Sequence, residues 1–245
     1  MKNKLILLTV LFTSFSAMAQ ELKKIQYTDQ SITHQAEAVI VKQNAPSVLV
    51  LPAWMGIDYE ARHDAEMLVN QGYNVFIADI YGMTDAPKDM EAAKKLSTYY
   101  KEHPEKYRHK IEVALNEFIK LGANKEKIAV IGYCFGGTGA LEAARGNMPF
   151  TGAVSIHGGL KKTDAIYNNI QPKVLVIHPA EDESVSKQDI DLFMDEMRKG
   201  NADWQFFYYA NSKHTFTNPQ SKDYNPLMTQ RAWKHILLFL DEVLK

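Results

Sequence analysis

The sequence contains a single cysteine, Cys134, among its 245 residues. A lone cysteine cannot form an internal disulfide, so the thiol is expected to be free. The sequence also lacks an excess of charge of either sign, because 28 basic and 29 acidic residues give a net charge of −1. So weak a charge argues against nucleic acid and anionic membrane surfaces as partners. Internal repeats and low-complexity linkers are absent as well, which favours a single domain.

A short apolar run near the N-terminus follows a basic start. Lys2 and Lys4 precede the apolar residues 5–12, and the stretch ends in Ala17-Met18-Ala19. These are the three parts of a secretory signal peptide, and the run is too short to span a bilayer. The pattern predicts cleavage after residue 19 and a mature chain 20–245 that is exported, either periplasmic or secreted. That chain carries 26 basic and 29 acidic residues, and no membrane attachment is expected.

Apolar strand patterns alternate with amphipathic helix patterns along the mature chain. The expected strands are 22–28, 36–42, 48–51, 73–80, 127–133, 150–156, 173–177 and 204–209. Such alternation predicts the α/β class, with a mostly parallel sheet of about eight strands covered by helices on both faces. Only the first two strands are expected to pair antiparallel. Ligands of such sheets bind beyond the carboxyl ends of the strands.

The most informative stretch joins the strand at 127–133 to a helix. It reads Gly132-Tyr133-Cys134-Phe135-Gly136-Gly137. Small residues on both sides of a central residue are typical of a nucleophile elbow, a strained strand-to-helix turn. Cys134 then lies at a helix N-terminus, where the helix dipole favours a thiolate. The alternative, from this stretch alone, is a buried cysteine that acts only as a small hydrophobe.

A thiol nucleophile needs a base, and the base needs an acid to orient it. The turn 181–183 follows one of the later strands, and His214 follows the last. The order nucleophile, acid, histidine is that of α/β-hydrolases. We assign Asp182 as the acid, because the shorter side chain on a tight turn is easier to hold rigid; Glu181 and Glu183 are the alternatives.

His214 lies in a polar loop just beyond a strand, where an active-site base is expected. Five other histidines are expected to face solvent: His34, His63, His103, His109 and His235. A metal site formed by His157, His178, Asp182 and His214 is the alternative for these histidines. Their spacing matches no zinc motif, so no metal and no other cofactor is expected.

The oxyanion of an acyl-transfer reaction needs two N–H donors. The backbone amide of Phe135 supplies one, and an amide of the loop after the strand at 48–51, assigned to Trp54, supplies the other. The Trp54 indole either lines the substrate pocket or packs in the interior. Other residues of the same sheet edge are assigned to the substrate pocket: Met55, Tyr81, His157 and Asn218.

Four stretches together resemble the dienelactone hydrolase family. They are the elbow at 132–137, His157-Gly158-Gly159-Leu160, Ala180-Glu181-Asp182-Glu183-Ser184-Val185, and His214-Thr215-Phe216-Thr217-Asn218-Pro219 with Tyr224-Asn225-Pro226 behind it. The resemblance implies a small α/β-hydrolase without a cap domain. It also implies a Cys-Asp-His triad that hydrolyses carboxylic esters and lactones, here Cys134, Asp182 and His214.

Two positions depart from that family pattern. The best-known members carry a glutamate that helps to deprotonate the thiol where this chain has Ala53. They also carry an arginine that holds a substrate carboxylate where this chain has Asn218. A neutral or differently charged ester is therefore as suitable a substrate as dienelactone.

The resulting hypothesis is an exported ester or lactone hydrolase that acts through a thioester on Cys134. The rival from another class is a small-molecule binding protein that keeps the fold without the chemistry, and the two departures motivate it. The partner is a small molecule in both cases. The oligomeric state does not follow from the sequence, and a monomer is the working expectation.

Overall fold

The computed structural model describes residues 21–161 and 169–245. Its centre is an eight-stranded sheet in the order β1-β2-β4-β3-β5-β6-β7-β8. The strands are β1 (Lys23–Asp29), β2 (Ile32–Val39), β3 (Ser47–Leu51), β4 (Asn74–Ile77), β5 (Ile128–Tyr133), β6 (Gly152–Ile156), β7 (Lys173–Pro179) and β8 (Trp204–Tyr209). Only the β1–β2 and β2–β4 pairings are antiparallel. The predicted mostly parallel sheet is confirmed, while the signal-peptide prediction concerns residues outside the described ranges.

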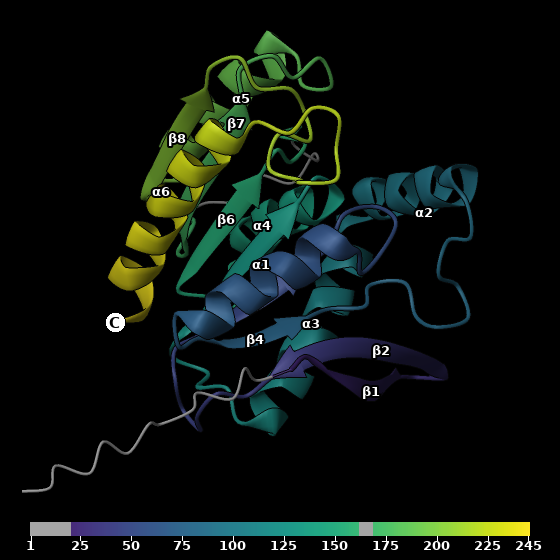
Figure 1. Cartoon of the computed structure of the whole chain (residues 1–245). Coiled ribbons are helices and arrows are strands. Elements are labelled where there is room, and N and C mark those ends of the chain that lie inside the picture. The colour runs from purple at the N-terminus through teal and green to yellow at the C-terminus, as the bar shows by residue number, and fades with distance from the viewer. Residues whose placement is uncertain (1–20, 162–168) are drawn as a thin grey trace, which may run out of the picture.

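Helices cover both faces of this sheet (Figure 1). They are α1 (Tyr59–Asn70), α2 (Met90–Glu102), α3 (Pro104–Leu121), α4 (Phe135–Arg145), α5 (Lys187–Lys199) and α6 (Pro226–Leu244). Side chains of a strand alternate between its two faces, so Leu49 and Leu51 of β3 join the core under α3 and α4. Val48 and Val50 join the core under α1 and α6. All four are fully buried, as a strand covered on both faces requires.

Local sequence explains where these helices begin and end. Asp58 caps α1 by accepting a hydrogen bond from the Ala61 amide, and Asp89 caps α2 in the same way through Ala92. Ser186 and Asp189 form the predicted capping box of α5. Gly122 ends α3 in the left-handed conformation, with φ of 118°. None of the helices in the described ranges is long and apolar enough to cross a membrane.

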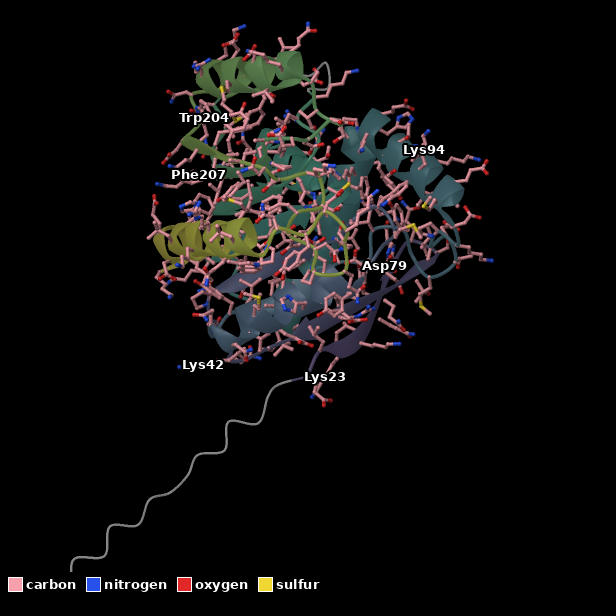
Figure 2. All side chains as sticks on the ribbon, turned by 45° about the horizontal axis from the view of Figure 1, so that its top comes forward. Lys23, Lys42, Asp79, Lys94, Trp204 and Phe207 are labelled. Atoms are coloured by element: carbon pink, nitrogen blue, oxygen red, sulfur yellow. The ribbon has the colours of Figure 1, made fainter. Side chains whose placement is uncertain are left out.

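The boundaries of two predicted strands were wrong. β2 begins at Ile32 and not at residue 36, and it pairs with β1 over its first seven residues. β4 ends at Ile77 and not at residue 80, because Asp79 turns the chain. Its Oδ1 accepts hydrogen bonds from the amides of Tyr81 and Gly82, and its Oδ2 accepts one from Gln35. Asp79 lies in the body of the molecule next to the β1–β2 hairpin, whereas Lys94 projects from α2 (Figure 2).

The prediction that His34 faces solvent was also wrong, since only 1% of it is exposed. Its Nδ1 lies 2.8 Å from the carbonyl oxygen of Asp79, and its ring stacks on Tyr27 at 5.0 Å. The Tyr27 hydroxyl donates to the same carbonyl. A polar residue can be buried when its polar atoms find partners, and this contact lies across the sheet, where local sequence gives no sign of it.

Arg145 at the end of α4 is fully buried and surrounded by acids. It donates to Glu142 at 2.9 Å and to both carboxylate oxygens of Glu196 at 3.0 and 2.8 Å, and it also donates to the Leu160 carbonyl. Arg145→Met would leave two buried carboxylates without this partner, at a cost of about 3–5 kcal/mol of unfolding free energy. Urea unfolding measures it. Arg198→Met, which removes an exposed pair with Asp195, is the matched control and should change stability little.

Candidate active site

Cys134 lies on a strained turn between β5 and α4, with φ of 51° and ψ of −109°. A side chain on Gly132 would place a Cβ 1.9 Å from the Gly136 oxygen, and one on Gly136 would come within 2.0 Å of the Leu51 oxygen. Glycine at these two positions is therefore a steric requirement of the turn. The turn presents Cys134 half-buried at the carboxyl edge of the sheet, the position of a nucleophile elbow.

Three side chains from separate loops meet at this edge. His214, after β8, has its Nε2 3.2 Å from the Cys134 Sγ and its Nδ1 2.8 Å from Asp182 Oδ2. Asp182, after β7, is 8% exposed. The neighbouring Glu181 and Glu183 are exposed, and Asp182 is the acid whose carboxylate contacts the imidazole. The contacts run from carboxylate to imidazole to thiol, as a nucleophile, base and orienting acid must.

Ser184 completes the surroundings of Asp182, and sequence reasoning missed it. Its amide and its hydroxyl lie 2.9 and 2.6 Å from Asp182 Oδ1, so this oxygen accepts two hydrogen bonds while Oδ2 faces His214. In an Asx turn the aspartate side chain accepts a hydrogen bond from the amide two residues later, so Asp182 in a polar turn is a local pattern that could have revealed this contact. The two donors fix which carboxylate oxygen faces the imidazole.

The electrostatics of His214 and Asp182 favour a proton on the imidazole. Burial acts to lower the pKa of His214, but hydrogen bonds with Asp182 and Cys134 outweigh it and raise that pKa to about 10. Burial acts to raise the pKa of Asp182, but hydrogen bonds from His214 and Ser184 outweigh it and hold that pKa at about 2. Asp182 is therefore ionised at neutral pH, and His214 is basic enough to keep a proton taken from the thiol.

The two amides assigned to the oxyanion come from two segments: Phe135 directly follows Cys134, and Trp54 lies in the loop after β3. Phe135 opens α4, where an N–H has no intrahelical acceptor. The Trp54 amide has no hydrogen-bond acceptor within the ranges that the structure covers. Tyr81 supports both: its hydroxyl donates to the Trp54 carbonyl at 2.9 Å, and its ring stacks on Phe135 at 5.7 Å. The Trp54 side chain is half-buried and packs against the core.

The residues assigned to the substrate pocket lie in different surroundings. Tyr81 is 3% exposed and His157 is 1% exposed. Both side chains are buried next to the elbow, where Tyr81 stacks on Phe135 and His157 accepts a hydrogen bond from the Cys134 amide. Their contact with substrate stays a prediction. Asn218 is half-buried, and its Oδ1 accepts a hydrogen bond from the Gln220 amide in its own turn. Met55 is 40% exposed on the loop after β3, so its side chain is open to solvent.

The remaining histidine of the carboxyl edge, His178, is 2% exposed and packs against Phe206 and Tyr208. Burial lowers its pKa to about 4, so the ring is neutral at physiological pH. Across residues 21–161 and 169–245 no three His, Cys, Asp or Glu side chains are grouped so as to hold a metal ion.

A thiol, an imidazole and a carboxylate in contact at the carboxyl edge of a mostly parallel sheet define an α/β-hydrolase. The model of the dienelactone hydrolase family matches residues 35–244. The chain therefore belongs to the dienelactone hydrolase family and is a dienelactone hydrolase-like hydrolase, as the sequence resemblance predicted.

Individual proteins and solved structures are also similar to this chain. The crystal structure of a dienelactone hydrolase-like promiscuous phosphotriesterase from metagenomic libraries superposes with a TM-score of 0.86 and 30% identity, covering 93% of this chain and 100% of that one. An uncharacterized protein of Caenorhabditis elegans is 32% identical over 148 residues, which are 56% of this chain and 94% of the relative. A putative carboxymethylenebutenolidase of Yersinia pestis is 23% identical over 206 residues, covering 78% and 76%.

Proposed function

We propose that this protein hydrolyses a carboxylic ester or lactone through a thioester on Cys134. The observation that carries the proposal is the pair of contacts at His214: 3.2 Å to the thiol sulfur on one side and 2.8 Å to Asp182 on the other. Family membership supports a small-molecule substrate. Relatives described as carboxymethylenebutenolidases support an ester or lactone bond as the one that is cleaved.

In the proposed reaction, His214 Nε2 takes the proton of the Cys134 thiol, and the sulfur attacks the substrate carbonyl carbon. The Phe135 and Trp54 amides donate to the oxyanion of the tetrahedral intermediate. The intermediate collapses with cleavage of the carbon–oxygen bond, and His214 returns the proton to the leaving alkoxide. Water, deprotonated by His214, then attacks the thioester, and the acid leaves as the thiol is reformed.

The substrate that we propose does not depend on a carboxylate for binding. The position that holds a family arginine is Asn218, whose side-chain oxygen caps its own turn. Ala53 likewise carries no carboxylate at the position where the family has a glutamate. Activation of the thiol therefore rests on His214, Asp182 and the N-terminus of α4.

Hydrolysis of a panel of small esters and lactones by the protein tests this function. Neutral activated esters are expected to be cleaved at least as fast as carboxylate-bearing lactones, and His214→Ala should remove the activity. A phosphotriester belongs in the panel, because a structural relative is described as acting on such compounds. No hydrolysis of any ester or lactone would favour the rival function, a binding protein that keeps the fold without the chemistry.

We further propose that the protein is exported after removal of residues 1–19. The support is the order of a basic start, a short apolar run and Ala17-Met18-Ala19. The expected mature chain begins at Gln20, which N-terminal sequencing of protein from the exported fraction checks. A chain recovered there with residues 1–19 still attached would contradict the proposed cleavage.

A further inference from the structure

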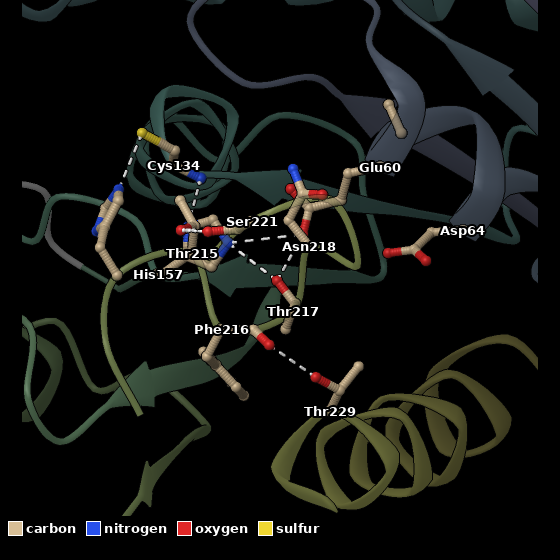
Figure 3. Close-up of polar contacts among 12 residues, drawn as sticks. Glu60, Asp64, Cys134, His157, Thr215, Phe216, Thr217, Asn218, Ser221 and Thr229 are labelled. Carbon is tan, nitrogen blue, oxygen red and sulfur yellow. Dashed lines mark hydrogen bonds and ion pairs between the residues drawn. The ribbon is translucent and has the colours of Figure 1, made fainter. Parts of the chain in front are cut away.

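A chain of buried hydrogen bonds runs behind the nucleophile from α1 to the elbow (Figure 3). It consists of Glu60 on α1, Thr217 in the loop before α6, and His157 at the end of β6. Their exposed fractions are 2%, 3% and 1%. The hydrolytic steps proposed above do not use any of the three. Buried polar groups are costly unless paired, so the pairing of these three needs an explanation.

The direction of each hydrogen bond in this chain follows from what the atoms can donate. The Cys134 amide nitrogen lies 3.2 Å from His157 Nδ1, and an amide only donates, so Nδ1 accepts and carries no proton. The proton of the neutral ring is then on Nε2, which lies 3.1 Å from Thr217 Oγ1. Thr217 thus has its own proton for Glu60 Oε1, at 2.6 Å. Every proton points toward the Glu60 carboxylate.

The amide at the end of this chain belongs to a residue with strained backbone angles. Cys134 has φ of 51°, and His157, at the end of the neighbouring strand, has φ of 40°. The Cys134 amide donates to the Ile156 carbonyl at 3.0 Å and is also held by His157. The position of this residue fixes both the sulfur that faces His214 and the following Phe135 amide. Release of the turn would therefore displace the nucleophile and one oxyanion donor together.

A protonated His157 ring is incompatible with this arrangement. A second proton on Nδ1 would point at the Cys134 N–H, so that one donor would face another. The His157 ring centroid lies only 5.0 Å from that of His214. Glu60 Oε1 lies 4.0 Å from His157 Nε2, a distance at which it could pair with a charged ring. The Thr217 hydroxyl contacts both groups and accepts the Nε2 proton in place of the carboxylate. The carboxylate therefore acts on the backbone of the turn, through two neutral groups.

We propose that Glu60, Thr217 and His157 are positioning residues that hold the nucleophile turn by fixing His157 as its neutral Nε2–H tautomer. They form a carboxylate-anchored relay to the Cys134 amide, in a chain whose loop after β3 offers Ala53 in place of a carboxylate beside the thiol. The effect of this relay on catalysis rests on the proposed hydrolytic function. The direction of its hydrogen bonds does not depend on that function.

Nitrogen NMR of the intact protein labelled with ¹⁵N-histidine tests the direction of the hydrogen bonds, because the chemical shift of a ring nitrogen changes strongly when that nitrogen is protonated. The His157 signals are assigned by their absence in His157→Gln. We expect an unprotonated Nδ1 and a protonated Nε2 between pH 6 and 8. A protonated Nδ1 in the unaltered protein would overturn the relay, whether or not any variant folds.

Thr217→Val tests the link, since it removes the hydroxyl and nearly keeps the shape. We expect Nδ1 of the His157 ring to become partly protonated. We also expect kcat for a cleaved ester to fall about 10-fold, which corresponds to the loss of one hydrogen bond, while KM stays within about 2-fold of its original value. Thr217→Ser restores the hydroxyl and should recover the tautomer and most of kcat. An unchanged ring pattern and unchanged kcat in folded Thr217→Val would overturn the proposal.

Thr229→Val is the matched control. Thr229 is also a buried threonine, and its hydroxyl lies 2.8 Å from the carbonyl oxygens of Phe216 and Asn225, next to the same loop but outside the relay. It should lower stability and leave the His157 tautomer unchanged. A tautomer change of equal size in this control would overturn the specific role of Thr217. The NMR measurements need no substrate, so they decide the relay even if the ester panel shows no hydrolysis.

Discussion

Replacement of Cys134 by alanine is expected to abolish hydrolysis of a small activated ester, with kcat at least about 10⁴-fold lower. The reason is that His214 Nε2 faces Sγ at 3.2 Å, and no second nucleophile is assigned at this turn. The fold should remain, because the substitution removes one half-buried sulfur and keeps the Cβ. Initial rates and a thermal melt of both proteins measure the two expectations.

Cys134→Ala that retains more than a tenth of the turnover would contradict the proposed nucleophile. A loss of activity accompanied by a collapsed melting temperature would not support it either, because unfolding alone explains such a loss. Gly139→Ala is unsuitable as a control, since a Cβ there would come within 2.5 Å of the Tyr107 hydroxyl oxygen. Glu183→Gln alters an exposed neighbour of Asp182 and is the appropriate control.

Asp182→Asn is expected to lower kcat by about 10³–10⁴-fold while the geometry stays intact. Ser184 donates to Oδ1 from its amide and its hydroxyl, so the asparagine oxygen will occupy that side. The NH₂ group must then face His214 Nδ1, which becomes an acceptor. The ring proton moves to Nε2 and points at Sγ, so the imidazole can no longer accept the proton of the thiol.

The pH dependence of Asp182→Asn provides a second readout. In the unaltered protein the carboxylate helps to raise the pKa of His214 to about 10. The attacking form is the thiolate beside the imidazolium that has taken its proton, so kcat/KM should fall as the pH rises through that region and the imidazolium, the proton donor to the leaving group, is lost. Removal of the negative charge destabilises the imidazolium and lowers its pKa. The alkaline limb should therefore move to lower pH, and an unmoved limb would contradict the role of Asp182.

Much of the fold was predictable because it depends on local pattern. The strands contain the continuous apolar runs 48–51 and 128–131, and both lie in the centre of the sheet. Cys134, Asp182 and His214 each follow a strand of the sheet, and parallel strands end at one edge, so the sequence alone predicts that the three side chains lie together.

The parts that were missed depend on contacts between distant residues. Thr217 and Glu60 are 157 positions apart, and nothing in the α1 sequence distinguishes Glu60 from an ordinary acid in the first turn of a helix. The burial of His157 and Tyr81 likewise depends on which loops pack over them. Asp64 on α1 is similarly hidden: burial raises its pKa to about 6, although it lies among the charged residues of a helix.

This chain differs from the family pattern in the source of the carboxylate near the elbow. A carboxylate is present close to the elbow, but it comes from α1 and reaches the Cys134 backbone through Thr217 and His157. With Ala53 in the loop after β3, proton transfer from the thiol falls to His214. Changes to the Asp182–His214 contact should therefore lower the activity strongly.

The central claim is that the reaction passes through a thioester on Cys134, and mass spectrometry of the intact protein tests it most directly. Turnover of a slowly hydrolysed ester is stopped with acid, and the protein is weighed and then digested. The account predicts a mass increase equal to the acyl group on the peptide that contains Cys134, and no increase in Cys134→Ala. Steady hydrolysis with no adduct at Cys134, or with the acyl group on another residue, would contradict it.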